Sequence, residues 1–113
     1  YYTANPDTDL FLTLGPNGAN PFYAFMDAEG LAPGDIKHGT FDLSPEIIAK
    51  IKDGTSMFGI DQQPFLQGYG AVMTLMLNVR YGVSSAVPVT ATGPGFVDLT
   101  NVEVVESLAG QYR

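Results

Sequence analysis

Four polar side chains of this 113-residue chain follow short apolar stretches. They are Asn17 after Leu10–Leu14, Asp42 after Ile36–Phe41, and Asp61 with Gln62 after Ser56–Ile60. A carboxylate such as Asp42 can accept hydrogen bonds from two vicinal hydroxyls of a polyol, and such charge-assisted bonds are strong. The Gln62 amide both donates and accepts, which suits a neutral hydroxylated ligand. The pattern predicts a site for a small polar molecule.

Each of these residues also has a purely structural interpretation. Asp42 can support the first turn of the helix that follows it by bonding to backbone amides. Asp61 and Gln62 can belong to a solvated turn between a strand and a helix. Asn17 fits a turn residue, and Asn20 fits a helix cap, although either could reach a ligand. Spacing alone leaves both interpretations open.

Enzymatic chemistry finds little support in the residue types. The only histidine, His38, lies in the middle of an expected strand and fits a packed residue better than a base that activates a nucleophile. Asp42 and Asp61 could hold Mg²⁺ in a phosphoryl-transfer site, but the first strand ends in Gly15-Pro16 without an acidic pair. We therefore predict no enzyme activity, no metal and no cofactor.

Composition excludes further partners. Twelve acidic against five basic residues give a net charge of −7, which repels nucleic acid and anionic membranes. The most apolar stretch, Phe65–Val79, is shorter than the roughly 20 residues that cross a bilayer.

Cysteine is absent, which excludes disulfides and thiolate chemistry. The chain begins with Tyr1 rather than Met, so we expect that processing or truncation removed a preceding segment.

The three apolar stretches are expected to be parallel strands, because a helix-like segment follows each one. Their carboxyl ends would then share one edge of a sheet, where open α/β folds bind ligands. The first stretch, Leu10–Leu14, is continuously apolar, so we expect helices on both of its faces.

Capping signals predict three helices, and the pattern is less regular toward the end of the chain. Asn20-Pro21 and Ser44-Pro45 each offer a cap followed by proline, which predicts helices that run to Gly30 and to just before Gly54. Pro64 opens a third helix that ends near Arg80. Because that helix is apolar around most of its circumference, we infer that it packs against something beyond this chain or against a second copy of it. The remaining expectations are strands at Val87–Val89 and Phe96–Leu99, a turn at Thr92–Gly95, and a short helix capped by Asn101.

A series of short motifs resembles the carboxyl-terminal part of type I periplasmic sugar-binding proteins over about residues 9 to 102. The motifs are Thr-Phe-Asp-Leu-Ser-Pro-Glu at 40–46, Ile-Lys-Asp-Gly at 51–54, Gly-Ile-Asp-Gln-Gln-Pro at 59–64, Gln-Gly-Tyr at 67–69 and Thr-Gly-Pro at 92–94. Each motif is weak alone, but their order and spacing together are fairly specific.

The resemblance implies an α/β fold with a flavodoxin-like parallel sheet and flanking helices, as part of a two-lobed binding protein. It implies that Asp42 and Gln62 contact a sugar, whereas Asp61 matches a more variable position. Family members often carry Asn where this chain has Gly15, which leaves the part played by Asn17 open. Neither the identity of the sugar nor the oligomeric state follows from the sequence.

The resemblance also implies a division of the chain. Residues 1–63 would belong to the carboxyl-terminal lobe, residues 64–86 would form a helix of the amino-terminal lobe, and residues 87–113 would return to the first lobe. The expected partners are a sugar or polyol, the missing amino-terminal lobe and the permease of an ABC importer, and the expected location is the bacterial periplasm.

Two alternatives remain at this point. The effector-binding core of a LacI-type repressor has the same fold, and a preceding helix-turn-helix rather than a secretory leader would identify it. A free-standing flavodoxin-like domain with an acidic pocket would respond to magnesium.

Overall fold

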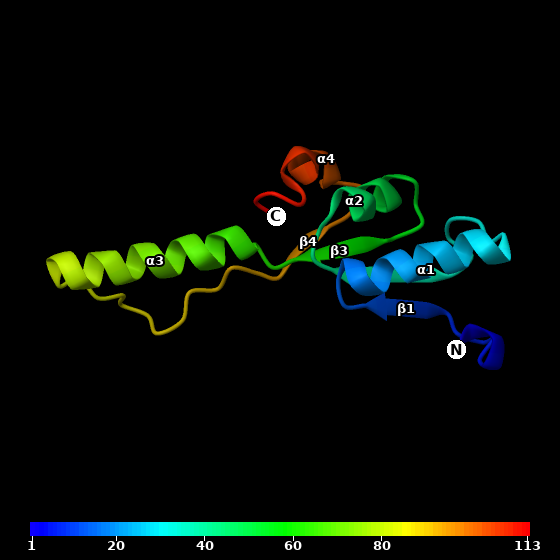
Figure 1. Cartoon of the computed structure of the whole chain (residues 1–113), viewed down its shortest axis with the longest axis horizontal. Coiled ribbons are helices and arrows are strands. Elements are labelled where there is room, and N and C mark those ends of the chain that lie inside the picture. Colours follow the sequence, from blue (N-terminus) through cyan, green and yellow to red (C-terminus); the bar gives the residue numbers. More distant parts are fainter.

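The structure, a computed structural model, describes all residues from 1 to 113 and consists of a small α/β body from which one long helix extends (Figure 1). Its extents are 59 × 29 × 21 Å and its radius of gyration is 17.8 Å, whereas a compact domain of this length has about 13 Å. Its accessible surface of 7367 Å² likewise exceeds the roughly 6000 Å² expected for a compact monomer of this mass.

The body contains one mostly parallel sheet, as the sequence predicted. Its strands lie in the order β1 (Leu10–Thr13), β2 (Lys37–Phe41), β3 (Phe58–Asp61) and β4 (Gly95–Val97). The first three strands are parallel, and β4 pairs antiparallel with β3. The carboxyl ends of β1, β2 and β3 therefore lie along one edge, which brings the segments after Thr13, Phe41 and Asp61 together.

Helix α2 (Pro45–Lys52) begins where the cap signal placed it. The Ser44 hydroxyl accepts a hydrogen bond from the amide of Ile47 at 3.2 Å, and Pro45 occupies the first helical position. The predicted apolar stripe is buried, with Ile47, Ile48 and Ile51 at most 2% exposed. Fully burying each of these side chains contributes about 1.5 to 3 kcal/mol, so this face anchors α2 on the body.

The predicted start of the first helix at Asn20-Pro21 is wrong. Helix α1 (Pro16–Glu29) begins five residues earlier, with Pro16 rather than Pro21 at its first position, and Pro21 lies inside it. Pro16 at the first position costs nothing, because the first amides of a helix have no intrahelical partner. Full burial of Ala19 holds this first turn against the body. Asn17 is therefore the second residue of a helix and not part of a turn.

The prediction that helices cover both faces of β1 is also wrong for this chain. The strand order increases steadily from β1 to β3, and right-handed crossovers that always step in one direction place their helices on the same face. Accordingly α1 packs against both β1 and α2. On the other face of β1, Leu10 and Leu12 are 52% and 53% exposed.

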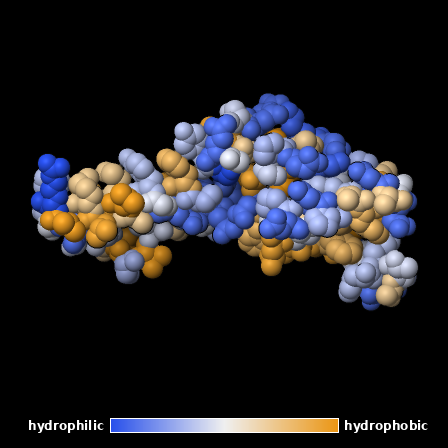
Figure 2. Space-filling view, viewed as in Figure 1, coloured by the Kyte–Doolittle hydropathy of each residue, from blue (hydrophilic) through white to orange (hydrophobic).

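Helix α3 (Pro64–Tyr81) has the predicted length but leaves the body. It follows Gln63, a non-glycine residue with a left-handed φ of 54°, and ends at Gly82. None of its residues is buried. Hydrophobic residues cover much of its visible surface (Figure 2). The expectation that this helix is not enclosed by its own chain is thus met.

The end of the chain differs in part from the prediction. Residues 83–94 form neither helix nor strand, so the strand expected at Val87–Val89 is absent. Strand β4 (Gly95–Val97) overlaps the expected Phe96–Leu99 and is shorter. Asn101 precedes α4 (Val102–Val105) without capping it, since its amide oxygen accepts from Asp98 N. Short 3-10 helices, η1 (Tyr2–Ala4) and η2 (Glu106–Leu108), complete the chain.

Candidate functional site

The end of β2 directs Asp42 toward the end of β3. Asp42 adopts a left-handed conformation with φ of 60°, which short polar residues tolerate better than others. Its amide donates to the carbonyl of Ile60 at 2.8 Å. Its carboxylate Oδ1 accepts a hydrogen bond from Gln62 Nε2 at 2.7 Å. Since Ser44 caps α2, the carboxylate of Asp42 is engaged across the sheet edge rather than by the helix.

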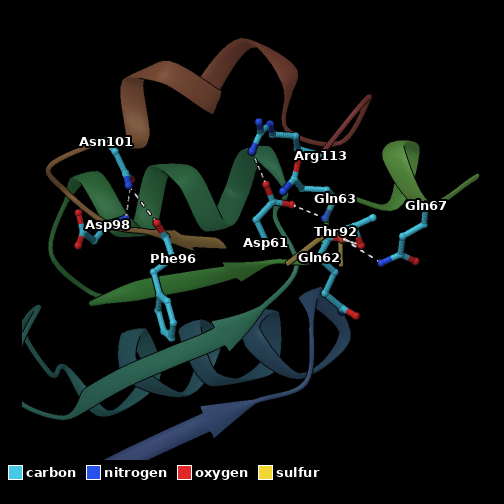
Figure 3. Close-up of polar contacts among 9 residues, drawn as sticks. All are labelled: Asp61, Gln62, Gln63, Gln67, Thr92, Phe96, Asp98, Asn101 and Arg113. Atoms are coloured by element: carbon cyan, nitrogen blue, oxygen red, sulfur yellow. Dashed lines mark hydrogen bonds and ion pairs between the residues drawn. The ribbon is translucent and has the colours of Figure 1, made fainter. Parts of the chain in front are cut away.

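Gln62 lies where the chain leaves the body, and its backbone is tied to two other segments. Its carbonyl oxygen accepts hydrogen bonds from Gln67 Nε2 at 2.8 Å and from Thr92 Oγ1 at 3.1 Å. Gln67 belongs to α3, and Thr92 belongs to the segment that returns from it (Figure 3). The side chain of Gln62 is exposed and points away from this junction, so its Oε1 is available to a ligand hydroxyl.

The loop after β1 closes on the same carboxylate. A Cβ atom on Gly15 would lie 3.4 Å from Asp42 Oδ2, and Gly15 has φ of 86°. Glycine therefore serves two needs here, because it permits this backbone conformation and leaves room beside the acid. Gly15, Asp42 and Gln62 thus converge at one edge from three successive strand ends.

Asn17 lies on the same edge, in the first turn of α1, and its side chain is exposed and makes no hydrogen bond to the protein. The structure places it near the ends of the strands without a direct link to Asp42 or Gln62.

Asp61 faces the opposite side from Gln62, because successive residues of an extended chain point to opposite faces. Asp61 is 1% exposed. Its Oδ2 pairs with Arg113 Nη1, and its Oδ1 accepts from the amide of Gln63 at 2.9 Å (Figure 3). The structure therefore does not bring Asp61 together with the other predicted site residues, and its carboxylate secures the carboxyl terminus of the chain.

His38 is a packed residue, as its place in a strand predicted. It is fully buried and stacks on Phe22 at 4.2 Å between ring centroids. Its Nδ1 lies 2.8 Å from Ser56 Oγ and its Nε2 3.0 Å from Thr13 Oγ1. Burial lowers the pKa of the imidazole to about 4, because desolvation disfavours the charged form. His38 therefore stays neutral in the core.

A shallow hollow of about 410 Å³ adjoins the edge. Phe41, Ile60 and Gln62 line it at the strand ends, Gln67 lines it from α3, and residues 90–94 of the returning segment complete it. No group of three or more His, Cys, Asp or Glu side chains is arranged to hold a metal ion. None of the helices combines the length and the apolar character that crossing a bilayer requires. The arrangement is suited to hydrogen bonding with a neutral polar molecule.

Four residues that take part in these contacts were given no role by their sequence. Gln67 and Thr92 belong to motifs of the family resemblance, but nothing in those motifs shows that both bond to one carbonyl oxygen. Gly15 was noted only as a departure from an expected Asn. Arg113, the partner of Asp61, carries no local signal because 52 residues separate them.

Comparison with known proteins gives a consistent result. A family model described as a periplasmic binding protein domain matches residues 1–82. The xylose/arabinose-binding protein XylF of Sulfolobus acidocaldarius is 37% identical over an alignment of 110 residues, and the alignment covers 91% of this chain and 27% of that protein.

Solved structures share the fold over nearly the whole chain. A carbohydrate transporter from Acidothermus cellulolyticus 11B, solved in complex with myo-inositol, is 34% identical with a TM-score of 0.84, over 96% of this chain and 37% of that one. A galactofuranose-binding protein, 17% identical with a TM-score of 0.78, shares the fold over 98% of this chain and 38% of that one. The chain thus spans between a quarter and two fifths of the length of these relatives.

Proposed function

Since this chain belongs to the family of periplasmic binding protein domains, we propose that it is part of a solute-binding protein that binds a sugar or polyol and delivers it to an ABC importer. The observation that carries the proposal is the contact between Asp42 and Gln62 at the shared edge of the sheet. In this pair Asp42 Oδ2 and Gln62 Oε1 accept no hydrogen bond from the protein, so an acceptor oxygen remains on each side chain. Acceptors of this kind suit the hydroxyl groups of a neutral sugar.

The proposed ligand residues are Asp42 and Gln62, with Asn17 at the edge of the site. Asp42 would hold two sugar hydroxyls, and Gln62 would contribute one more contact from the point where the chain leaves the body. Asp61 was also predicted to reach the ligand, but its ion pair with Arg113 gives that assignment no support. The names of the two relatives above 30% identity, which mention xylose, arabinose, carbohydrate and myo-inositol, favour a sugar or polyol.

We further propose that the cleft closes between two lobes. Residues 1–63 and 87–113 would form one lobe, and the helix within 64–86 would belong to the amino-terminal lobe, supplied by the rest of the polypeptide. The absence of any buried residue in α3 supports this division. So does the bond from Thr92 to the carbonyl of Gln62, which joins the outgoing and returning segments. We also propose that the permease of an ABC importer is a partner and that the location is the periplasm, and membership of this family supports both proposals.

The alternative is the effector-binding core of a LacI-type repressor. A LacI-type transcriptional regulator from Bacteroides fragilis has a TM-score of 0.75 with this chain at 20% identity, which is a likeness of fold alone. A helix-turn-helix in the preceding sequence of the complete gene would favour this alternative, and a secretory leader would favour the transporter.

Melting temperatures of the complete polypeptide test the proposed function. The panel contains pentoses, hexoses and polyols, including xylose, arabinose and myo-inositol, with magnesium chloride as the test of a metal site. A ligand at 100 times its Kd stabilises the native state by about 2.7 kcal/mol, so a selective rise is expected for one sugar class and none for magnesium. A panel without any response would refute the proposal.

The 113 residues alone provide a second test. We expect weak or undetectable sugar binding, because half of the cleft is missing. Micromolar binding by this segment would contradict the division into lobes.

A further inference from the structure

An ion pair with a buried carboxylate lies directly beside the proposed ligand residue Gln62. The preceding residue, Asp61, is 1% exposed, and its Oδ2 pairs with Arg113 Nη1. A carboxylate taken out of water loses its hydration, so such a pair adds little stability compared with apolar residues of the same volume. The proposed sugar contacts do not use this pair. Its position next to Gln62 therefore points to a role other than stability.

The side chains of Asp61 and Gln62 point to opposite sides of the chain (Figure 3). Arg113 holds Asp61 on one side. On the other side, Gln62 donates to Asp42 Oδ1 at 2.7 Å. Because successive residues of an extended chain alternate, the direction of the first side chain sets the direction of the second.

The second oxygen of the Asp61 carboxylate restrains the backbone beyond Gln62. Oδ1 of Asp61 accepts a hydrogen bond from the amide of Gln63 at 2.9 Å. Gln63 has a left-handed φ of 54°, a conformation that costs free energy unless the surroundings hold it. Gln62 thus lies between two residues whose geometry depends on one carboxylate.

The segment that carries Arg113 is itself anchored to the body. Ala109 is 6% exposed, and the amide of Arg113 donates to the carbonyl of Leu108 at 3.2 Å. A Cβ atom on Gly110 would lie 3.2 Å from Pro45 Cδ, so the segment packs closely on the first turn of α2. The position of Arg113 is therefore set by the body and not by Asp61 alone.

The same segment also contacts the start of α3. The ring of Tyr112 meets the ring of Phe65 edge-on, with 4.8 Å between their centroids. Phe65 is the second residue of α3. Tyr112 and Arg113 therefore contact the chain on both sides of Gln62, within the five residues that lead from β3 into α3.

We propose that Arg113 is a positioning residue of the sugar site, which acts through Asp61 to hold the Gln62 amide toward Asp42. The inference rests on the proposed function, since it concerns the same site. Without Arg113 the Asp61 carboxylate would be buried without a partner, which is strongly unfavourable, so it turns toward water. Rotation of the chain at Asp61 then carries Gln62 out of reach of Asp42.

The side-chain amide of Gln62 reports this positioning in the complete polypeptide without any sugar. NMR measures how fast its Nε2 protons exchange with water, and Gln62→Ala identifies the signal by its loss. Arg113→Met should speed the exchange about 10-fold or more, the factor for loss of a hydrogen bond to a charged group. Lys52→Met is the matched control, because it breaks an exposed ion pair with Glu106 instead. Equal exchange in Arg113→Met and Lys52→Met would overturn the proposal.

Two further variants separate positioning from a general loss of structure. Asp61→Asn added to Arg113→Met leaves a neutral side chain that can stay buried and still accept from the Gln63 amide, so slow exchange should return. Exchange that stays fast would contradict the route through Asp61. If Arg113→Met does not fold, Arg113→Gln removes the charge but keeps N–H donors. Its Gln62 amide should still exchange faster than in the control, and no difference would equally overturn the proposal.

Calorimetry of the complete polypeptide with xylose, arabinose and myo-inositol connects the positioning to binding. Arg113→Met should weaken binding about 10-fold, but less than about twofold when Gln62→Ala is also present, because the contact is then already lost. Equal losses in both backgrounds would show that Arg113 acts on the fold alone. Faster amide exchange in Arg113→Met without binding of any of these sugars would refute the proposed function alone. Sugar binding with unaltered exchange would refute this inference alone.

Discussion

The side chain of Gln62 donates a hydrogen bond from Nε2 to Oδ1 of Asp42 at 2.7 Å, across the ends of two neighbouring parallel strands. This contact fixes the orientation of the Gln62 amide, since its nitrogen faces the acid and its oxygen faces outward. The carbonyl of Gln62 is held at the same time by Gln67 and Thr92. One residue thus connects the candidate site to the two segments that join the body to α3.

Replacement of Asp42 is expected to weaken sugar binding in the complete protein. Asp42→Ala should cost about 1.5 to 3 kcal/mol of ligand affinity, the range for hydrogen bonds to a charged group, with little loss of fold stability. Asp42→Asn tests the charge alone, because Asn tolerates the same left-handed backbone. Calorimetry measures the affinity, with Glu103→Gln on the exposed surface of α4 as control. An unchanged affinity for both Asp42 variants would count against this site.

A negative charge introduced at position 62 is expected to weaken sugar binding through its repulsion of Asp42. Gln62→Glu replaces the donor with a second carboxylate beside the first, so like charges repel and sugar affinity falls. Gln63→Glu adds the same charge one residue further on, where the native side chain makes no hydrogen bond with Asp42, and should have a smaller effect. The affinity of both variants is measured by titration with the sugar that the melting panel identifies. Equal losses of affinity would show that only the net charge is involved.

Glycine at position 15 is expected to be required both for the local backbone conformation and for sugar binding. Gly15→Ala forces a φ of 86° on a residue with a Cβ and places that atom 3.4 Å from Asp42 Oδ2. Gly34→Ala is a matched control, because Gly34 has φ of 92° and open space around the new atom. Both variants should lose about 1 to 3 kcal/mol of stability from backbone strain. Only Gly15→Ala should also weaken sugar binding, as measured by calorimetry.

Buried His38 is expected to make stability depend on pH. Burial lowers the pKa of its imidazole to about 4 from the ordinary value of 6.5. The unfolded chain therefore binds the proton more readily, so this contribution is fully present above pH 6.5 and is lost as the pH falls toward 4. Because His38 is the only histidine of the segment, chemical shifts of its labelled imidazole can follow it directly. A midpoint near 6.5 would contradict the prediction.

Thermal unfolding between pH 4 and 7.5 separates this effect from the carboxylates. The variant His38→Gln cannot titrate at this position, whereas the acidic residues are the same in both proteins. Unmodified protein should lose more stability than the variant between pH 6.5 and 4, and parallel profiles would show that the imidazole does not contribute.

Local signals predicted the sheet and two of the helices well. Three apolar stretches gave the three parallel strands, Ser44-Pro45 gave the start of α2, and Pro64 gave the start of α3. The start of α1 could not be predicted from the cap rule, because Pro16 and Pro21 both satisfy the preference for proline at the first position. Burial of Ala19 against the body, which no local pattern reports, decides between them.

The candidate site was predicted only in part. Asp42 and Gln62 were identified because each follows a predicted strand, and the structure brings them into contact. The same signal identified Asp61, yet this side chain faces Arg113 on the opposite side. Adjacent residues in an extended chain diverge, so the direction of each depends on the register of β3 beside β2 and β4.

The sequence alone determined that parallel strands end at a common edge and carry polar side chains there, because periodicity and caps are local properties. Only the tertiary structure decided which of those side chains meet, that α1 and α2 lie on one face, and that α3 and the returning segment are left uncovered. These outcomes depend on strand order and on contacts between residues distant in sequence, which no local pattern encodes.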